Sequence, residues 1–307
     1  MLFDSLSDPV TLYEVGPRDG LQNESASVDT AGKLELVDAL VDAGITRIEV
    51  TSFVSPKWIP QLADAEALLA ALQPARASYS ALCPNARGLA RVRKTALSEI
   101  TVFVSASEEH NKKNINASID ESIAQLREVV QEAKGLGLRV RGCVSTAWGF
   151  RSAHDVEIET VARIGNALME MGCTELSLGD TMGIATPLAT RDVLLRVLAD
   201  HPAKVLSMHM HDTRGTALAN VLVGLELGLR TFEAAIGGLG GCPYAPGAAG
   251  NLATEDLVYM LRGMGVETGV DLDGLIRAGV IAARLVGHAL PGKVHRVGVA
   301  SSSSFGS

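Results

Sequence analysis

The sequence predicts an α/β fold, a TIM (β/α)8 barrel with additional C-terminal helices. Eight short β-rich segments follow one another along the 307 residues, and a segment with helical periodicity trails each of them. No linker, charge block or shift of composition divides the chain before residue 265. We therefore expect a single domain over residues 1–307, with the barrel at about 8–265, a helical extension at about 266–292 and a frayed tail at 300–307.

The eight expected strands are short runs that are rich in β-branched and apolar residues. They span residues 10–15, 47–52, 77–83, 99–105, 139–145, 174–180, 204–212 and 231–238. The alternative fold, a doubly wound sheet, is disfavoured because that fold calls for a glycine-rich phosphate turn after an early strand, and the sequence has none.

The segments between these strands have the apolar spacing of amphipathic helices. The first two lie at 30–43 and 61–72, and the clearest, at 119–130, repeats its apolar residues on one helical face. Glycines in "DAGI" (42–45), "GLGL" (135–138) and "MGC" (171–173) are typical helix stops. A further helix is expected at 271–290, after the barrel.

Composition and charge exclude several classes of protein. The chain is 47% hydrophobic and 20% charged with a net charge of −8, which disfavours a general nucleic-acid or membrane surface but allows an anionic small molecule in a local basic pocket. No apolar run is long enough to cross a membrane, and "MLFDSLSDPV" fits neither a signal nor a transit peptide. The four cysteines are widely spaced without a CxxC pair, so we expect a reducing, cytoplasmic setting.

Polar residues gather where the expected strands end, which is where TIM barrels carry their active sites. The ends of strands one, two and six supply Arg18 and Asp19, Glu49, and Asp180. The ends of strands seven and eight supply the pair His209 and His211, then Cys242 and Asn251. Folding alone does not explain why apolar strands should each finish in a carboxylate, an imidazole or a thiol.

The histidines of "HMHDTRG" (209–215) are two residues apart, so an extended backbone places both imidazoles on one face, with Cα atoms roughly 6–7 Å apart. They are either hydrogen-bonded in the barrel mouth or ligands of one metal ion. Asp19 and Asn251 lie on strands that neighbour strand seven once a barrel closes, which favours the metal. Two nitrogen and two oxygen donors without a thiolate suit Mg²⁺ or Mn²⁺.

Each of the other polar residues has both a structural and a functional interpretation. Residues 237–251 contain six glycines, and form either a loop with unusual dihedral angles or a mobile lid that carries Cys242, as a reactive thiol, over the site. Arg18 is either part of a structural salt bridge or a guanidinium that stabilises an oxyanion. Glu49 and Asp180 are general acid and base, or partners that orient the histidines and the arginine.

Six segments in the same order resemble the 3-hydroxy-3-methylglutaryl-CoA lyase family, over about residues 10–290. They are "VGPRDGLQNE" (15–24), "IEVTSFVSPKW" (48–58), "KKNIN" (112–116), "SLGDT" (177–181), "HMHDT" (209–213) and "GGLGGCPYAPGAAGNLATEDLVYML" (237–261). The last segment is the most specific of them. The resemblance implies a TIM barrel that uses a divalent metal to split a tertiary 3-hydroxy acyl-CoA into acetyl-CoA and a keto acid, which is acetoacetate for the family named.

The resemblance also implies roles for individual residues. Those that match metal ligands of the family are Asp19, His209, His211 and Asn251. Those that match residues implicated in catalysis are Arg18, Glu49, Asp180 and Cys242. The chemistry of the cleavage itself requires a carboxylate or imidazole that takes the 3-hydroxyl proton, with Asp180 or His209 as a relay.

Some positions depart from the family pattern, and they concern the substrate more than the chemistry. Ser25 replaces a lysine, Arg214 a tyrosine and Thr216 a glutamine, and "STAWGFRSAH" (145–154) replaces a Cys-Pro-Tyr-Glu-Gly stretch. Within that stretch Trp148, Phe150 and Arg151 either reshape the pocket or reflect neutral drift in a rim loop.

Several alternatives therefore stay open. The same chemistry on citramalyl-CoA would give acetyl-CoA and pyruvate. A metal-dependent hydrolase is more remote, because such enzymes place the histidine pair on an early strand and further histidines at later strand ends, which the remaining histidines do not provide. A non-catalytic binding protein is also more remote, because every candidate ligand and the loop cysteine are present. The expected partner is an acyl-CoA, with Lys57, Lys112 and Lys113 as candidate cations for it and a homodimer as a candidate assembly.

Overall fold

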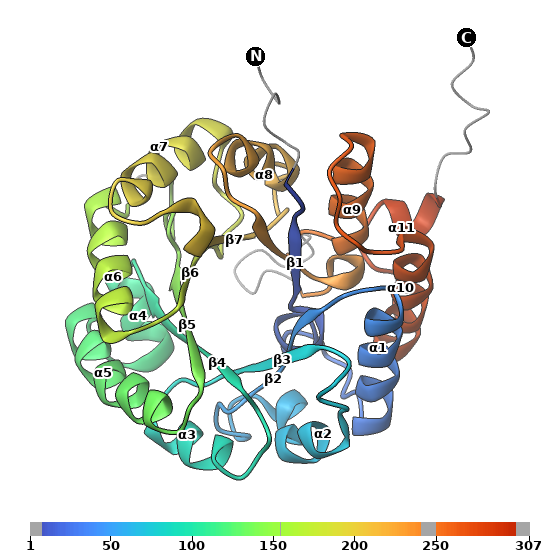
Figure 1. The fold of residues 1–307 in the computed structure, drawn as a ribbon, viewed down its shortest axis with the longest axis horizontal. Helices are drawn as coiled ribbons and strands as arrows, with labels where there is room; N and C mark the ends of the chain where they lie inside the picture. Colours follow the sequence, from blue (N-terminus) through green and yellow to red (C-terminus); the bar gives the residue numbers. More distant parts are fainter. Residues whose placement is uncertain (1–7, 154, 241–249, 299–307) are drawn as a thin grey trace.

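The structure is a computed structural model that describes residues 8–153, 155–240 and 250–298. Eight parallel strands pair in sequence order, and β8 pairs back with β1, so the sheet closes into a barrel. Figure 1 looks down this barrel and shows the helices arranged around the strands. The predicted TIM barrel is confirmed.

All eight strands lie within the segments predicted from sequence. They are β1 (Thr11–Glu14), β2 (Arg47–Ser52), β3 (Ser78–Leu82), β4 (Glu99–Ser105), β5 (Arg139–Ser145), β6 (Glu175–Asp180), β7 (Leu206–Met210) and β8 (Thr231–Ala234).

Helices follow the strands and cover the outside of the barrel. They are α1 (Thr30–Asp42), α2 (Ala65–Ala71), α3 (Ala86–Val92), α4 (Glu108–Ile115), α5 (Ile119–Gly135), α6 (Ile158–Met171), α7 (Pro187–Leu198), α8 (Ala217–Glu226), α9 (Thr254–Gly263), α10 (Leu272–Val286) and α11 (Val294–Val297). Four short turns of other helix types are η1 (Gly16–Gly20), η2 (Pro60–Leu62), η3 (Ala203–Val205) and η4 (Ile236–Gly238).

The two strands that flank the predicted metal site are shorter than the sequence predicted. β7 starts after the 3-10 turn η3 and ends at Met210, so His211 lies in an isolated bridge with Asn251. β8 ends at Ala234, because Gly237 and Gly238 have φ angles of 64° and 71° that a strand does not accommodate. The backbone therefore turns where the predicted site residues begin.

The inside and the outside of the sheet differ in polarity. Apolar side chains such as Ile48, Val102 and Leu178 are fully buried, and they belong to the core that the helices cover. The barrel interior instead contains a charged cluster around Arg141, which is only 1% exposed. A polar interior of this kind supports the candidate site described below.

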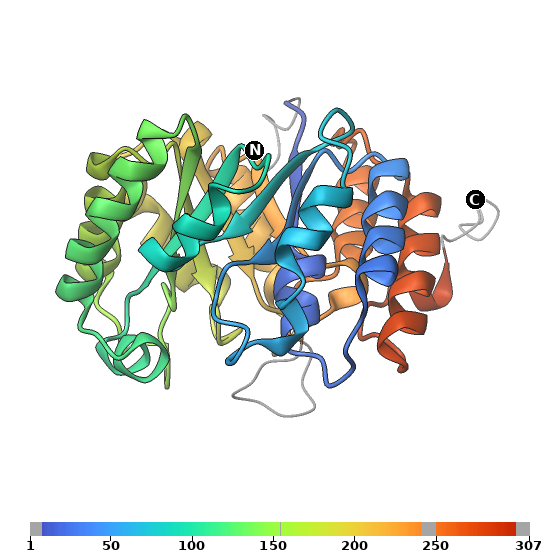
Figure 2. The ribbon, with the colours of Figure 1, turned by 90° about the horizontal axis from the view of Figure 1, so that it is seen from below.

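The helices at the end of the chain return to its beginning. α10 lies beside α1, as Figures 1 and 2 both show at the edge of the barrel where the chain closes. A Cβ on Gly32 of α1 would come within 2.7 Å of Leu285 Cδ2 of α10, so a larger residue here would displace the Leu285 side chain. Asp271 caps the start of α10, because its carboxylate accepts the N–H groups of Asp273 and Gly274.

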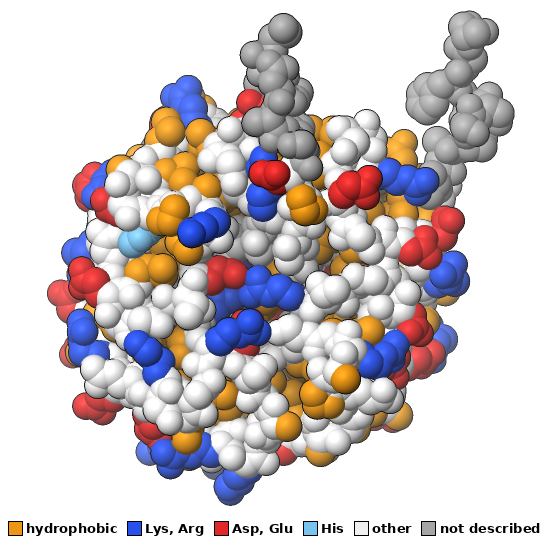
Figure 3. All heavy atoms as spheres, viewed as in Figure 1, with side chains coloured by type: hydrophobic (Ala, Val, Ile, Leu, Met, Phe, Trp, Pro, Cys, Tyr) orange, Lys and Arg blue, Asp and Glu red, His pale blue; other side chains and the backbone are white. Residues whose placement is uncertain are grey.

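Within the described ranges, no helix is long and apolar enough to cross a membrane. On the face shown in Figure 3, basic and acidic side chains are interspersed, with a group of basic side chains near the centre. The described face therefore lacks the broad basic surface that nucleic-acid binding would need.

Candidate metal centre and active site

The turn after β1 places two of the predicted site residues in the barrel mouth. In η1 the carbonyl oxygen of Val15 accepts the N–H groups of Arg18 at 3.1 Å and Asp19 at 2.7 Å. This tight turn follows the strand at once because Pro17 occupies its first positions, where no N–H is needed. Arg18 and Asp19 are thereby held at the carboxyl end of the barrel.

The two histidines face each other as the sequence pattern suggested. Their Nε2 atoms lie 3.1 Å apart, and the ring centroids are 5.1 Å apart with planes tilted by 58°. His209 lies on β7 in register with Gly179 of β6 and Glu233 of β8. Although His211 lies beyond the end of the strand, its bridge with Asn251 keeps it on the same side.

The structure brings the four predicted metal ligands together. Ligand atoms of Asp19, His209 and His211 all lie within 4.8 Å of one another. Asn251 joins them through its Nδ2, which donates to Asp19 Oδ2 at 2.7 Å. These residues come from the ends of β1, β7 and β8, which are neighbours in the closed barrel.

The arrangement of donor atoms fits a divalent cation. Asn251 is 2% exposed, yet its Oδ1 has no hydrogen-bond partner among the residues described. Two imidazole nitrogens in close contact and a buried amide oxygen without a donor are groups that a cation would satisfy. Two nitrogens and two oxygens, with no thiolate, match the preference of Mg²⁺ or Mn²⁺.

The charges in the centre keep Asp19 ionised. Burial opposes the charge on Asp19, but Arg18 and the two histidines outweigh it and lower the pKa of the carboxyl to about 2. Arg18 Nη1 donates to Asp19 Oδ1 at 2.5 Å, and its Nε donates to Glu49 Oε2. Asp19 is therefore available as an anionic ligand at neutral pH.

The two histidines differ in their surroundings. Burial lowers the pKa of His209, but the hydrogen bond and charge of Glu233 outweigh this effect and raise the pKa above its ordinary value. For His211, burial and the neighbouring His209 lower the pKa to about 3. His211 Nδ1 has no partner in the described part of the chain, whereas His209 Nδ1 contacts Glu233 Oε2 at 3.1 Å.

Glu49 lies within β2 rather than at its end, because the strand continues to Ser52. It is 1% exposed, and its Oε2 accepts from Arg18. Its Oε1 is buried and accepts no hydrogen bond from any described residue. Glu49 thus has one oxygen fixed by the guanidinium and one that is available.

Asp180 ends β6 and supports the turn that follows. Its two oxygens accept the N–H groups of Ile184 and Ala185, both at 3.0 Å. Burial raises the pKa of Asp180 to about 6, despite these hydrogen bonds and the charges of His209 and Arg214. Asp180 is close enough to His209 to interact with its charge, but both carboxylate oxygens of Asp180 already accept backbone N–H groups.

The remaining predicted residues are Cys242 and three lysines. Cys242 lies outside the described residues. Lys57 and Lys112 are exposed, and Lys113 pairs with Glu109 at 2.6 Å.

Three residues of the segment 145–154, which departs from the family pattern, make contacts with neighbouring helices. Trp148 is 3% exposed and donates from Nε1 to Ala189 O of α7 at 3.2 Å. Phe150 is also buried, with its ring centroid 4.9 Å from that of His110. Arg151 lies on the surface, where it pairs with Glu109 of α4. These contacts attach the described part of the segment to α4 and α7.

The sequence analysis missed the acidic residue beneath the histidines. Glu233 lies in the middle of the apolar segment "TFEAAIGG", and its carboxylate contacts both His209 and Arg141. A charged residue at the third position of an otherwise apolar strand was the available signal, since alternation places it on the inner face with Thr231.

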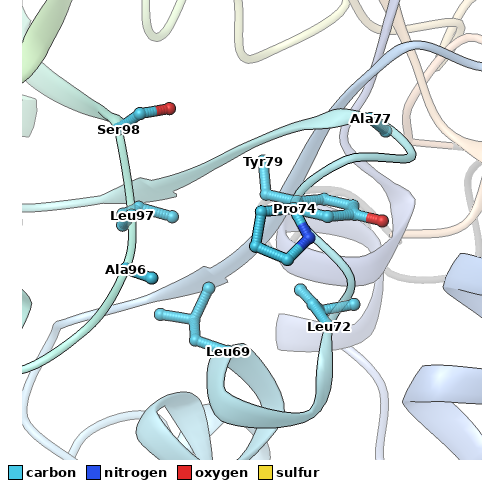
Figure 4. A pocket seen from close by; sticks show the side chains of 8 residues that line it. All are labelled: Leu69, Leu72, Pro74, Ala77, Tyr79, Ala96, Leu97 and Ser98. Atoms are coloured by element: carbon cyan, nitrogen blue, oxygen red, sulfur yellow. The ribbon is translucent and has the colours of Figure 1, made fainter.

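A separate cavity lies away from these residues. A small cavity of about 40 Å³ lies between α2 and the beginnings of β3 and β4, and Figure 4 shows the side chains that line it. It is lined by Leu69, Leu72, Pro74, Ala77, Tyr79, Ala96, Leu97 and Ser98. It carries no carboxylate, imidazole or thiol and lies at the amino ends of the strands, so it is not the site.

The fold and the site define a TIM-barrel protein with a candidate divalent-metal centre at the carboxyl ends of its strands. The family model described as HMGL-like matches residues 9–281, and the chain belongs to this family.

Individual relatives are similar over nearly their whole length. The mitochondrial hydroxymethylglutaryl-CoA lyase of Bos taurus is 46% identical over 93% of this chain and 88% of its own. The crystal structure of the Bacillus subtilis HMG-CoA lyase is 46% identical and superposes with a TM-score of 0.93, over 95% of this chain and 98% of that one. An Acinetobacter baumannii HMG-CoA lyase in complex with coenzyme A and 3-methylmalate is 37% identical, with a TM-score of 0.91 over 97% and 98% of the two chains.

Proposed function

We propose that this protein is a divalent-metal-dependent lyase that cleaves 3-hydroxy-3-methylglutaryl-CoA into acetyl-CoA and acetoacetate. The observation that carries the proposal is the convergence of Asp19, His209, His211 and Asn251 at the barrel mouth, next to the Arg18–Glu49 pair. The similarity to enzymes named hydroxymethylglutaryl-CoA lyase supports this substrate.

In the proposed site these four residues hold Mg²⁺ or Mn²⁺. A bound divalent metal would lower the pKa of the substrate 3-hydroxyl group and fix the position of the substrate. Asp19 contributes the negative charge, since its pKa of about 2 keeps it ionised. Burial of His209 and His211, at 9% and 4% exposed, limits competition from water.

Arg18 is the proposed stabiliser of the enolate that forms when the C2–C3 bond breaks. Its Nε and Nη1 are engaged by Glu49 and Asp19, which fixes the plane of the guanidinium. Its Nη2 makes no hydrogen bond to a described residue, so it is available to the thioester oxygen, on which negative charge develops.

Glu49 is the proposed acceptor of the 3-hydroxyl proton. The sequence left Glu49, Asp180 and His209 as alternatives, and their contacts favour Glu49. Its Oε1 accepts no hydrogen bond, whereas both oxygens of Asp180 hold backbone N–H groups and His209 belongs to the proposed ligand set. Asp180 then acts as a positioning residue for the β6 turn.

Cys242 is proposed to protonate the enolate carbon and give the methyl group of acetyl-CoA. The proposal rests on its place in the segment "GGLGGCPYAPGAAGN", which begins within η4 and ends at Asn251. Both ends of that segment adjoin the candidate metal centre, since Asn251 Nδ2 also donates to Leu239 O at 3.0 Å.

Two departures from the family pattern make structural contacts and give no reason to prefer citramalyl-CoA. Arg214 donates from Nη1 to Met182 O at 2.9 Å and Gly183 O at 3.0 Å. Thr216 Oγ1 donates to Ala185 O at 2.9 Å. Both residues therefore brace the turn after β6, and neither change by itself requires a different acyl group.

The test is an assay of purified protein with Mg²⁺ or Mn²⁺ and a panel of 3-hydroxy acyl-CoAs, in which acetyl-CoA and the keto acid are measured separately. We expect acetoacetate from 3-hydroxy-3-methylglutaryl-CoA at a higher kcat/KM than pyruvate from citramalyl-CoA. A higher kcat/KM with citramalyl-CoA would make citramalyl-CoA the substrate of the same cleavage reaction. Release of no acetyl-CoA from any member would overturn the proposed function.

We also propose that the protein forms a homodimer and is located in the cytoplasm. A homodimer is tested by sedimentation of the purified protein. A cytoplasmic location is suggested by widely spaced cysteines and tested by cell fractionation.

Exposed Lys57 and Lys112 are the proposed contacts for the CoA phosphates, and charge reversal at either should raise KM more than it lowers kcat.

A further inference from the structure

Glu233 lies beneath the histidine pair and is almost completely buried. It is 4% exposed and stands in register with His209 across the β7–β8 pairing. Its Oε2 lies 3.1 Å from His209 Nδ1, and its Oε1 accepts from Arg141 Nη2 and Ser177 Oγ. The two oxygens of this carboxylate thus serve different partners.

Arg141 fixes the orientation of that carboxylate. Its Nε donates to Glu175 Oε1 at 2.5 Å and its Nη2 to Ser207 Oγ at 2.6 Å. The centre of its guanidinium lies 4.1 Å from the centroid of the Tyr13 ring, and this cation–π contact adds to the hydrogen bonds that hold the side chain. With Arg141 held on all sides, Glu233 cannot rotate away from His209 without losing a buried charge pair.

The contact with Glu233 determines which nitrogen of His209 carries the proton. A carboxylate only accepts hydrogen bonds, so a neutral His209 must carry its proton on Nδ1. Its Nε2 then has a lone pair that points to His211 Nε2, 3.1 Å away. We infer that Glu233, anchored by Arg141, is a positioning residue that holds His209 as the Nδ1–H tautomer and so presents Nε2 as a ready metal ligand.

The same geometry makes the two histidines inequivalent. Because His209 Nε2 is an acceptor, His211 Nε2 must be the donor of their contact, which leaves His211 Nδ1 without a proton. That nitrogen is buried and has no partner among the described residues, as expected for a bare acceptor rather than an N–H group. His209 is thus preorganised for a metal, whereas His211 must change its tautomer.

An isosteric substitution reverses this arrangement. In Glu233→Gln, Arg141 and Ser177 still donate to the position of Oε1, so the amide oxygen must occupy it. The amide NH2 group then faces His209 Nδ1 and donates to it, which forces the proton of His209 to Nε2. The substitution changes no side-chain volume, yet it should block the ligand nitrogen.

Glu175→Gln is the matched control. Glu175 also accepts from Arg141, at 2.5 Å, and from Arg47, at 2.8 Å, so this variant removes one charge from the same cluster. Neither oxygen of Glu175 contacts a histidine in any described interaction. A general weakening of the cluster would affect both variants, whereas a tautomer effect should appear only in Glu233→Gln.

The test combines two measurements and rests on the proposed metal centre only in the second. In metal-free protein at alkaline pH, a two-bond ¹H–¹⁵N spectrum reports the tautomer of His209, whose signals are identified by their loss in His209→Gln. Calorimetry then measures Mn²⁺ affinity. We expect Nδ1–H in the wild type and Glu175→Gln, Nε2–H in Glu233→Gln, and a Mn²⁺ affinity lowered about 10–100-fold in Glu233→Gln alone.

A wild-type spectrum showing Nε2–H would overturn the inference, and this outcome needs no variant to fold. So would an unchanged tautomer in Glu233→Gln, or an equal loss of Mn²⁺ affinity in Glu175→Gln. Absence of Mn²⁺ binding by the wild type would overturn the proposed metal centre itself, and the tautomer spectrum distinguishes that failure from a failure of Glu233.

Discussion

Asn251 Nδ2 donates to Asp19 Oδ2 at 2.7 Å and thereby joins the segment after β8 to the turn after β1, across 232 residues of sequence. The same side chain has an oxygen that is buried without a partner. One half of this amide therefore organises the candidate centre, while the other half is left for a ligand.

Substituting Asn251 by alanine should weaken metal binding more than it weakens the fold. The change removes the unpartnered Oδ1 and releases Asp19, so we expect Mn²⁺ affinity, measured by calorimetry, to fall at least about 10-fold. Asn220→Ala is a close control, since Asn220 is also buried, donates to Ala185 O and has an unpartnered Oδ1, but lies away from the histidines. Equal Mn²⁺ affinities in the two variants would contradict this role.

The Arg18–Glu49 pair allows stability and catalysis to be separated. Arg18→Met leaves the carboxylate of Glu49, 1% exposed, without its partner, so unfolding free energy should fall by about 3–5 kcal/mol. The double variant Arg18→Met with Glu49→Gln removes the isolated charge and should recover most of that stability.

Activity should not recover in the double variant, because the proposed enolate contact and the proposed proton acceptor are both missing. Urea denaturation and acetyl-CoA release measure the two effects. If the double variant regains turnover along with stability, the pair is structural only.

The cysteines should differ sharply in reactivity. Burial raises the pKa of the thiols of Cys83, Cys143 and Cys173 to about 12, so they carry almost no thiolate at neutral pH. If Cys242 is the proposed acid, an alkylating reagent should modify it first, and turnover should fall in step with that modification, as followed by peptide mass spectrometry.

The corresponding variants sharpen this prediction. Cys242→Ala should retain Mn²⁺ and substrate binding while kcat falls by orders of magnitude. Cys173→Ala, which removes a buried core thiol at the end of α6, should leave kcat near that of the wild type. Near-normal turnover in Cys242→Ala would exclude the thiol as the acid.

Glu255 should make the fold less stable as the pH rises. Burial raises the pKa of Glu255 to about 8, although Gly237 N donates to its Oε2 at 2.9 Å. In the unfolded chain the same carboxyl has a pKa of about 4.3. The folded protein therefore binds one more proton between these values, and its unfolding free energy falls as pH rises, by at most about 1.4 kcal/mol per pH unit.

Glu255→Gln cannot ionise and should flatten this slope in urea denaturation between about pH 6 and pH 8. Glu35→Gln, which removes an exposed carboxylate paired with Arg284, controls for the loss of one negative charge. Parallel pH profiles for the wild type and Glu255→Gln would show that the buried carboxyl does not control this dependence.

The pattern of strands could be predicted because each buried strand is a local run of apolar residues with its own turn signals. β2, β4 and β5 begin and end at the predicted residues. β7 and β8 do not, since their ends are set by the bridge of His211 to Asn251 and by the turn at Gly237. The bridge joins residues that are far apart in the sequence, and the turn interrupts an apolar run, so local periodicity records neither.

The sequence alone determined which side chains reach the carboxyl mouth, because strand order in a barrel follows chain order and strand ends are local. It named Asp19, His209, His211 and Asn251 on that basis. Only the tertiary structure decided their roles relative to neighbours: that Glu49 keeps an open oxygen, that both oxygens of Asp180 are used, and that Glu233 contacts His209. Hydrogen bonds depend on positions within a few tenths of an ångström, and the closed barrel sets those positions.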